Sequence, residues 1–137
     1  MPDTLKLELV SPERLLVSEQ VEMVLVPGKD GVFGVLPLHA PTLSTLKPGF
    51  VDIYKGNVVV ERYFVAGGFA EVSPAGCTIL VDEALSQETL TQALATERQT
   101  MAKALYDAAA TDEDRKAALK ALEIADAMLS AANGALH

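Results

Sequence analysis

Hydrophobic and polar residues alternate at the start of the chain as they do in half-buried β-strands. Leu5, Leu7 and Leu9 are separated by Lys6 and Glu8, which is a period of two. Further runs rich in β-branched or aromatic residues follow at residues 21–26, 51–53, 58–65 and 77–81. Short strands separated by about 8 to 12 residues are typical of a β-sandwich or a barrel.

Turn residues lie between these runs. Residues 55–57 read Lys-Gly-Asn, and residues 73–76 read Ser-Pro-Ala-Gly. The second tetrapeptide has Pro and Gly where a type I turn prefers them. Both segments predict tight hairpins, so we expect antiparallel pairing rather than crossover connections through helices.

The periodicity becomes helical after about residue 84. Leu90, Leu94, Met101 and Leu105 recur at helical spacing and predict a first helix with one apolar face, for which Ser86 is the candidate N-cap. Glu97 interrupts this stripe.

A second helix is predicted to begin at Thr111. The Thr-x-x-Asp spacing resembles a capping box, and residues 112–114 are acidic, which suits the positive end of a helix dipole. The two helices would be joined around residues 107–111 as an αα-hairpin. The predicted apolar face of the second helix consists of Ala118, Leu122, Ala125 and Leu129.

Composition divides the chain at the same place. All seven prolines, eight of the nine glycines and six of the seven aromatic residues precede Ser86, whereas sixteen alanines lie from Ala84 to Ala135. We therefore predict a β-sandwich N-terminal domain, residues 1–84, followed by an α-helical hairpin, residues 85–137.

Charge and hydropathy exclude several classes of protein. A net charge of −8 with 11 basic residues argues against nucleic-acid binding. No secretory or transit segment is recognised at the start, and the longest uncharged run, residues 31–46, is too short to cross a bilayer and contains two prolines. Membrane association is expected only through partners. A single cysteine fits a reducing compartment.

Catalytic and metal-binding sets are not recognised in the sequence. A nucleophile needs a base nearby, and the one pair that can be written, Cys77 with His39, places the thiol in an apolar strand, where cysteine is usually inert. One internal histidine does not make a zinc site. We predict no catalytic residue, no cofactor and no metal.

The segment from residue 27 to residue 49 is unusual. It holds four prolines and four glycines but little charge. The spacing of Gly28, Gly31 and Gly34 is not followed by a helix, so turns between strands explain these glycines better than a phosphate loop does. An apolar, proline-stiffened surface usually contacts something.

Residues 28–49, GKDGVFGVLPLHAPTLSTLKPG, resemble a signature of the epsilon subunits of bacterial and chloroplast rotary ATP synthases. That signature reads approximately G-x-x-G-x-x-G-x-x-P-x-H-A-P-x-x-x-x-L-x-P-G. The resemblance extends to LVSP at residues 9–12, VAGGFAEV at 65–72 and TILV at 78–81. It covers essentially the whole chain, strongly to Asp82 and loosely beyond.

The resemblance implies a sandwich that binds the gamma subunit, which is the rotor shaft, and rests on polar loops of the membrane-embedded c-ring. A mobile two-helix tail follows. The matched gamma-contact positions are Ser11, His39 and Ser44. The matched c-ring positions are Lys29, Asp30, Gly31 and Val32. From the residues alone, His39 can equally be a histidine bonded to backbone in a turn, and Lys29 and Asp30 a solvated hairpin tip.

This chain departs from the family pattern at several positions. Some relatives have an acid where Val32 stands, and a Gly is common at Leu38. Relatives whose tail binds ATP carry Ile/Leu-Asp-x-x-Arg-Ala, whereas residues 90–95 here read LTQALA. The second helix offers only Arg115, Lys116 and Lys120 for a contact with the beta subunit of the catalytic head. We therefore expect ATP sensing and self-inhibition to be weak or absent.

The resemblance therefore implies a non-catalytic rotor subunit of a proton-translocating ATP synthase. We expect it on the cytoplasmic face of the bacterial inner membrane, with a chloroplast-encoded origin as the open alternative. It would couple c-ring rotation to ATP synthesis. A nucleotide-responsive regulatory module is the main alternative. An independent ligand-binding sandwich and a hydrolase built on Cys77 are weaker readings.

Overall fold

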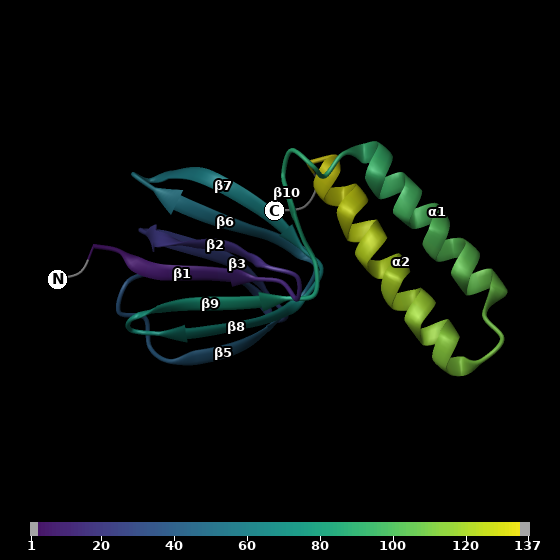
Figure 1. Ribbon diagram of the computed structural model, residues 1–137, viewed down its shortest axis with the longest axis horizontal. Coiled ribbons are helices and arrows are strands. Elements are labelled where there is room, and N and C mark those ends of the chain that lie inside the picture. Colours follow the sequence, from purple (N-terminus) through teal and green to yellow (C-terminus); the bar gives the residue numbers. More distant parts are fainter. Residues whose placement is uncertain (1–2, 135–137) are drawn as a thin grey trace. The chain divides into compact units, whose positions relative to one another are not determined.

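The chain forms one all-β unit and one all-α unit in a computed structural model that describes residues 3–134 (Figure 1). The compact units are residues 1–87 and 88–137, and each is treated by itself below. The predicted fold class, a β-sandwich followed by an αα-hairpin, is confirmed. The predicted domain ranges, 1–84 and 85–137, stay a prediction.

Ten strands make up the β-unit within the described residues. They are β1 (Leu5–Val10), β2 (Leu15–Val21), β3 (Met23–Gly28), β4 (Gly31–Val35), β5 (Thr42–Leu46), β6 (Gly49–Lys55), β7 (Val58–Val65), β8 (Gly68–Ser73), β9 (Gly76–Val81) and β10 (Ala84–Ser86).

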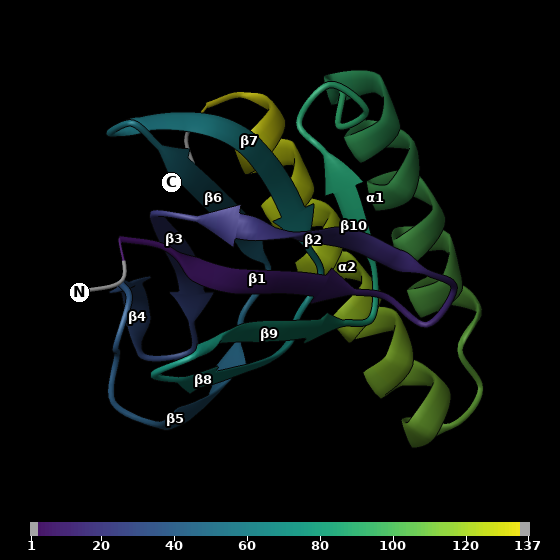
Figure 2. The same cartoon turned by 60° about the vertical axis from the view of Figure 1, so that its left-hand side comes forward.

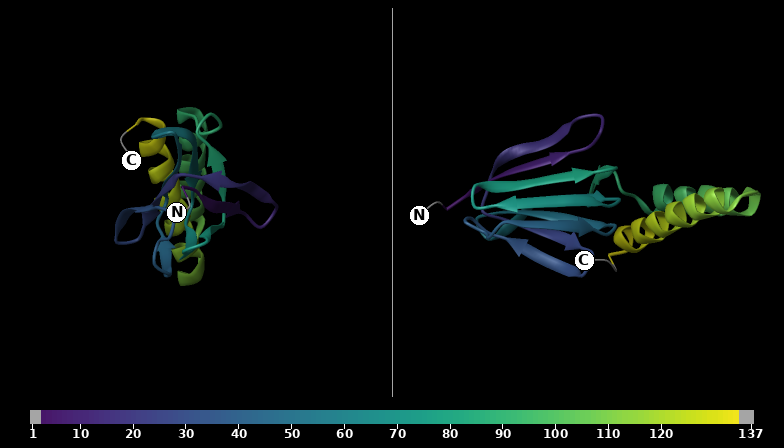
Figure 3. Two further views of the ribbon diagram at one scale, coloured as in Figure 1. Left: turned by 90° about the vertical axis from the view of Figure 1, so that its left-hand side faces the viewer. Right: turned by 90° about the horizontal axis from the view of Figure 1, so that it is seen from below.

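The strands form two layers that share one hydrogen-bonded path (Figures 2 and 3). One layer has the order β4-β3-β6-β7-β10, and the other has the order β5-β8-β9-β1-β2. Strand β3 joins them, because Met23–Leu25 pair with β6 while Gly28 pairs with Leu46 of β5. All pairings are antiparallel except β1 with β9, so the expectation of mainly antiparallel pairing is confirmed.

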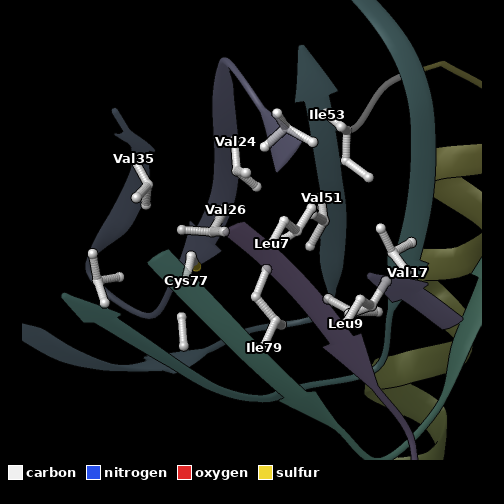
Figure 4. Packing of buried hydrophobic residues seen from close by; sticks show 14 of the residues in the cluster. Leu7, Leu9, Val17, Val24, Val26, Val35, Val51, Ile53, Cys77 and Ile79 are labelled. Carbon is white, nitrogen blue, oxygen red and sulfur yellow. The ribbon is translucent and has the colours of Figure 1, made fainter. Parts of the chain in front are cut away.

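Aliphatic side chains from both layers fill the space between them (Figure 4). Leu7 and Leu9 of β1 are fully buried, as the alternation of residues 5–9 predicted. They lie in one cluster with Val26 of β3 and Ile53 of β6, from the other layer. Burying each such side chain contributes on the order of 1.5–3 kcal/mol, so this cluster is the main source of stability of the sandwich.

Five strands were not predicted: β2, β4, β5, β8 and β10. The predicted run 21–26 in fact joins the end of β2 to most of β3. Strands β4 and β5 were missed because the segment 27–49 is rich in proline and glycine, which usually mark turns. Here all four glycines lie in paired strands, and a Cβ at Gly28 or Gly49, each at the end of its strand, would lie less than 3 Å from a neighbouring strand.

Both predicted hairpin turns are confirmed. Gly56 and Asn57 form the two-residue turn between β6 and β7 with φ of 64° and 63°, the geometry of a type I′ turn. Pro74 and Ala75 connect β8 to β9. Gly76, which follows, is also required by packing against β1, because a Cβ there would lie 2.4 Å from the carbonyl oxygen of Lys6.

An ion pair and two aromatic rings occupy the outward positions of β6 and β7. Arg62 donates to both carboxylate oxygens of buried Asp52, at 2.7 and 3.1 Å. The hydrogen bond to this carboxylate raises the pKa of Arg62. Its guanidinium carbon also lies 4.6 Å from the ring centre of Phe50, which meets Phe64 edge to face. Because Asp52 and Arg62 are cross-strand partners, the ion pair and the stacked cation stabilise the pairing of β6 with β7.

Helix α1 (Gln92–Ala108) differs from its prediction in two respects. Thr91 is the N-cap, its hydroxyl accepting from the Leu94 amide at 3.1 Å, whereas the predicted cap, Ser86, lies in β10 opposite Tyr63. The predicted apolar face is wrong in its second half. Leu90, just before the helix, is buried and Leu94 is half-buried, but Met101 and Leu105 are 56% and 58% exposed. The buried positions within the helix are Ala95 and Ala102, each next to a predicted one.

Helix α2 (Asp112–Ala132) packs against α1. Thr111 caps it as predicted, with its hydroxyl 3.0 Å from the Asp114 amide. Ala118 and Ala125 of the predicted face are buried, and Leu122 and Leu129 are half-buried. Among residues 3–134, neither helix is long and apolar enough to cross a membrane.

Substitutions at two glycines can measure how closely neighbouring strands pack in the sandwich. Gly68 has φ of +139°, and a Cβ there would lie 2.1 Å from the carbonyl oxygen of Leu80. We expect Gly68→Ala to lower the free energy of unfolding by about 3 kcal/mol or more, from backbone strain plus displacement of β9. Urea unfolding of the full chain measures this loss.

Gly56→Ala is the matched control. Gly56 also has positive φ, +64°, but its Cβ would meet nothing within 4 Å. Only the backbone strain of about 1 kcal/mol should appear. Equal losses for the two variants would contradict the proposed close approach at Gly68.

Candidate interaction surfaces

The tip of the β3–β4 hairpin brings together the residues matched to c-ring contact. Lys29 and Asp30 form its two-residue turn, and Gly31 and Val32 begin β4. All four are exposed, Val32 by 42%. We call these four residues the β3–β4 tip.

Close backbone packing holds the β3–β4 tip in place. A Cβ on Gly28 would lie 2.6 Å from the carbonyl oxygen of Gly31, so only glycine fits at the base of the turn. The amide of Lys29 donates to the carbonyl of Thr45 in β5 at 2.8 Å. The tip is therefore attached to both layers.

Ser11 lies in the turn between β1 and β2. Its amide and carbonyl exchange hydrogen bonds with Arg14, at 3.0 and 3.3 Å. Its hydroxyl also donates to the Arg14 carbonyl at 3.3 Å, and the residue is only 8% exposed. The side chain therefore stabilises the turn.

His39 lies in the loop between β4 and β5, residues 36–41. Its Nδ1 is 2.7 Å from the carbonyl oxygen of Ala40, and its amide donates to the Leu36 carbonyl at 3.2 Å. The reading of His39 as a histidine bonded to backbone in a proline-bounded turn is confirmed. The ring is half-buried, so part of it remains accessible.

Ser44 lies in the middle of β5, opposite Ala70 of β8. It is half-buried, and its hydroxyl donates to the Thr45 carbonyl at 3.2 Å. The strand registers place Ser11 near the end of the sandwich that carries the β3–β4 tip, and His39 at the opposite end, beside Pro74. The three residues matched to gamma contact thus do not form one cluster.

An apolar row on the outer face of the second layer connects these positions. Leu15 is paired with Val10, Val10 with Leu80, and Leu80 with Phe69. We call these four residues the outer stripe. It begins beside Ser11 and ends at Phe69, whose partner Thr45 follows Ser44.

The outer stripe faces away from the core. Each member alternates with an inward residue such as Leu9, Ile79 or Ala70, all fully buried. Leu15, Leu80 and Phe69 are 52%, 48% and 52% exposed, and Leu43 on the next strand is 72% exposed. Val10, between Leu15 and Leu80, is half-buried. A registered row of large apolar residues across four strands, most of them exposed, is typical of a binding surface.

Sequence reasoning did not find the outer stripe. Residues 69 and 80 occupy positions that an alternating strand normally fills with polar residues. The apolar residues at these two positions are visible in the sequence, but only the strand register shows that Phe69 and Leu80 are neighbours on one face of the sheet.

Cys77, the one nucleophile that the sequence pairs with a base, is buried. Cys77 points into the core, and its burial raises the pKa of the thiol to about 12. It is therefore a protonated, inert side chain at neutral pH. No group of three or more His, Cys, Asp or Glu side chains within residues 3–134 is arranged to hold a metal ion.

The β-unit matches a known family. Residues 4–87 match the family model described as "ATP synthase, Delta/Epsilon chain, beta-sandwich domain". Over 98% of its length the chain is 48% identical to the whole of an ATP synthase epsilon chain from Rhodospirillum rubrum. It is 45% identical to the epsilon chain of Paramagnetospirillum magneticum, covering 96% of this chain and 98% of that one.

Solved structures have the same fold. A chain in the Euglena gracilis mitochondrial ATP synthase, a structure described as OSCP/F1/c-ring, aligns with a TM-score of 0.78 and 26% identity over 96% of this chain and 82% of that one. A chain in the Tetrahymena thermophila mitochondrial ATP synthase, described as central stalk and c-ring, aligns with a TM-score of 0.68. It covers 93% of this chain and 96% of that one, and its 14% identity supports the fold alone.

Proposed function

Because the chain belongs to the family of ATP synthase epsilon chains, whose members are non-catalytic subunits, we propose that it is a rotor component of the central stalk of a proton-translocating F-type ATP synthase. It couples rotation of the c-ring to ATP synthesis through contacts with the gamma subunit and the c-ring. No cofactor takes part in this role.

The outer stripe is the observation that carries the proposal. It presents an apolar surface that leads from the turn of Ser11 to the strand of Ser44. Ser11 and Ser44 themselves have local hydrogen bonds, so the apolar side chains between them are the stronger source of affinity. We place the gamma subunit on this face, with His39 at its far end.

The β3–β4 tip is proposed to contact the polar loops of the c-ring. It combines a cation, an anion and an exposed valine on a two-residue turn. The tip is also joined to the outer stripe through backbone, because Lys29 bonds to Thr45 and Thr45 pairs with Phe69. Torque received from the ring can therefore pass to the gamma-facing layer through main-chain hydrogen bonds rather than through flexible side chains.

The position in the cell follows from this role. A subunit that contacts both the gamma subunit and the c-ring is peripheral on the cytoplasmic face of the bacterial inner membrane. Its membrane association comes through the complex alone.

Regulation by the helical hairpin is proposed to be weak. The start of α1 has Thr91 as its cap and no charged residue in its first turn, so an ATP phosphate finds no cation there. In α2 the basic residues Arg115, Lys116 and Lys120 lie within the first half of the helix, and Arg115 already pairs with Asp112 at 2.7 Å. A strong contact with an acidic loop of the beta subunit is therefore not expected, and the alternative function as a nucleotide-responsive module is disfavoured.

The first prediction concerns the outer stripe. Phe69→Thr and Leu80→Thr should each weaken binding to the gamma-containing catalytic complex by roughly tenfold, since truncated interface anchors lose this much. Titrating the labelled full chain into the complex depleted of it measures the affinity.

Folding should be preserved in both variants. Threonine keeps a β-propensity close to that of the residues replaced, and the sites are half exposed, so stability should change by only about 0.5 kcal/mol. Val58→Thr, at a 59% exposed valine of the other layer, is the control and should bind normally. Unchanged affinity for both stripe variants would refute the placement of gamma.

The second prediction concerns the β3–β4 tip. A cysteine introduced as Asp30→Cys should form a disulfide with a cysteine placed in the polar loop of the c subunit, in the assembled enzyme under mild oxidation. Cys77 should not interfere, because its thiol is buried and protonated. Cross-linked product is measured by non-reducing electrophoresis.

Ala75→Cys supplies the comparison. Ala75 is exposed in the two-residue β8–β9 turn at the opposite end of the sandwich. It should give no product with the ring. Equal cross-linking from both positions would show that the ring contact is not specific to the tip.

The third prediction concerns the hairpin. Deleting the residues after Gln87 keeps β10 paired with β7 and should change the ATPase rate of the complex less than twofold. ATP at millimolar concentration should not show saturable binding to the isolated full chain. Steady-state hydrolysis and calorimetric titration measure these two quantities. Large activation on truncation, or tight saturable ATP binding, would overturn the proposal of weak regulation.

A further inference from the structure

Leu38 has a backbone conformation that leucine rarely adopts. Its φ is +66°, in the left-handed region. A residue with a Cβ there costs roughly 1–2 kcal/mol relative to the right-handed region. Among the described residues, Asn57 is the other non-glycine with positive φ, and asparagine tolerates that region far better.

The loop that contains Leu38 imposes this conformation. The amide of Leu38 donates a hydrogen bond to the Pro74 carbonyl at 3.3 Å. The amide of His39 donates to the carbonyl of Leu36, three residues earlier in the loop. Pro37 and Pro41 restrict φ on either side, and the Thr42 hydroxyl bonds the Ala40 carbonyl at 3.0 Å. The backbone is held from several directions, so the strain persists.

Burial does not explain why a leucine stands there. Leu38 is 48% exposed, its neighbour Leu36 is 55% exposed, and neither belongs to the core cluster. Glycine would adopt the same φ without strain. The isolated chain therefore gains little from this side chain, which points to a contact outside the chain.

We propose that Leu38 is an anchor residue that inserts into an apolar site on the gamma subunit. This inference rests on the proposed function and adds a specific residue to it. Residues 31–46 carry no charge, and Leu36 and Leu43 are exposed beside Leu38, so an apolar site is the complement of this loop. The loop runs through His39 into β5, where Leu43 is 72% exposed.

The c-ring is not the occupant. The β3–β4 tip lies at one end of β3 and β4, and the loop of Leu38 follows the opposite end of β4, at the β8–β9 turn. A five-residue strand separates them by about 16 Å at 3.3 Å per residue. A ring that contacts the tip with a flat surface across the sandwich end does not reach Leu38.

Four variants in the full chain test this assignment. Leu38→Gly removes the side chain and the strain, and Leu38→Ala removes the side chain but keeps the strain. Leu38→Met keeps an apolar side chain of similar volume. Leu119→Ala, at a 50% exposed leucine of α2, is the matched control. Each is titrated into the gamma-containing catalytic complex and unfolded in urea.

We expect Leu38→Gly and Leu38→Ala to bind about tenfold more weakly, with Leu38→Met and Leu119→Ala within about threefold of the unmodified chain. The urea midpoint of Leu38→Gly should be equal or higher, because strain is relieved. Unchanged affinity of the Gly and Ala variants would overturn the assignment. So would a fall in the urea midpoint of both, which would give Leu38 a structural role.

Failure of this inference can be told from failure of the proposed function. If Phe69→Thr weakens binding and the Leu38 variants do not, gamma still binds the outer stripe and Leu38 is not its anchor. If neither the Leu38 variants nor the two stripe variants, Phe69→Thr and Leu80→Thr, weaken binding, the placement of gamma on the outer stripe is refuted as well.

Discussion

The change of partner along one edge of β3 is the constraint on which the rest of the sandwich depends. Its first half pairs with β6, and Gly28 at its end pairs with Leu46 of β5. Pro27 lies between the two pairings, where it needs no amide hydrogen, and its carbonyl accepts from Lys47 at 2.9 Å. One strand thus belongs to both layers, and their inner faces are brought together to bury a single aliphatic cluster.

The same junction in β3 provides the backbone connection through which we propose that torque passes from the c-ring to the gamma-facing layer. The β3–β4 tip continues directly from Gly28, and its Lys29 amide is bonded to β5. From β5, antiparallel ladders lead across β8 and β9 to the outer stripe. Since the inner faces are buried against each other, the exposed side chains of the outer stripe, such as Leu80 and Phe69, are left to bind a partner. Leu38 extends this surface at the cost of local backbone strain.

Sequence periodicity predicted element type better than it predicted which residues are buried. In α1 the large apolar residues Met101 and Leu105 made up the second half of the predicted face, yet Ala102 is buried and they are exposed. The reason is close packing: alanine lets two helices approach, and the larger side chains are left outside. The segment 27–49 shows the opposite failure, because its prolines and glycines concealed two strands that only pairing across the sheet makes stable.

By itself the sequence determined the two fold classes, the alternation of β1, both two-residue turns, the cap at Thr111 and the resemblance that led to the family. These features depend on local periods, turn chemistry and short motifs. Only the tertiary structure decided that Phe69 and Leu80 adjoin, that Ser11 is buried within its turn, and that Leu38 is strained. Strand register and loop hydrogen bonds join residues far apart in the chain, and a linear pattern does not contain that information.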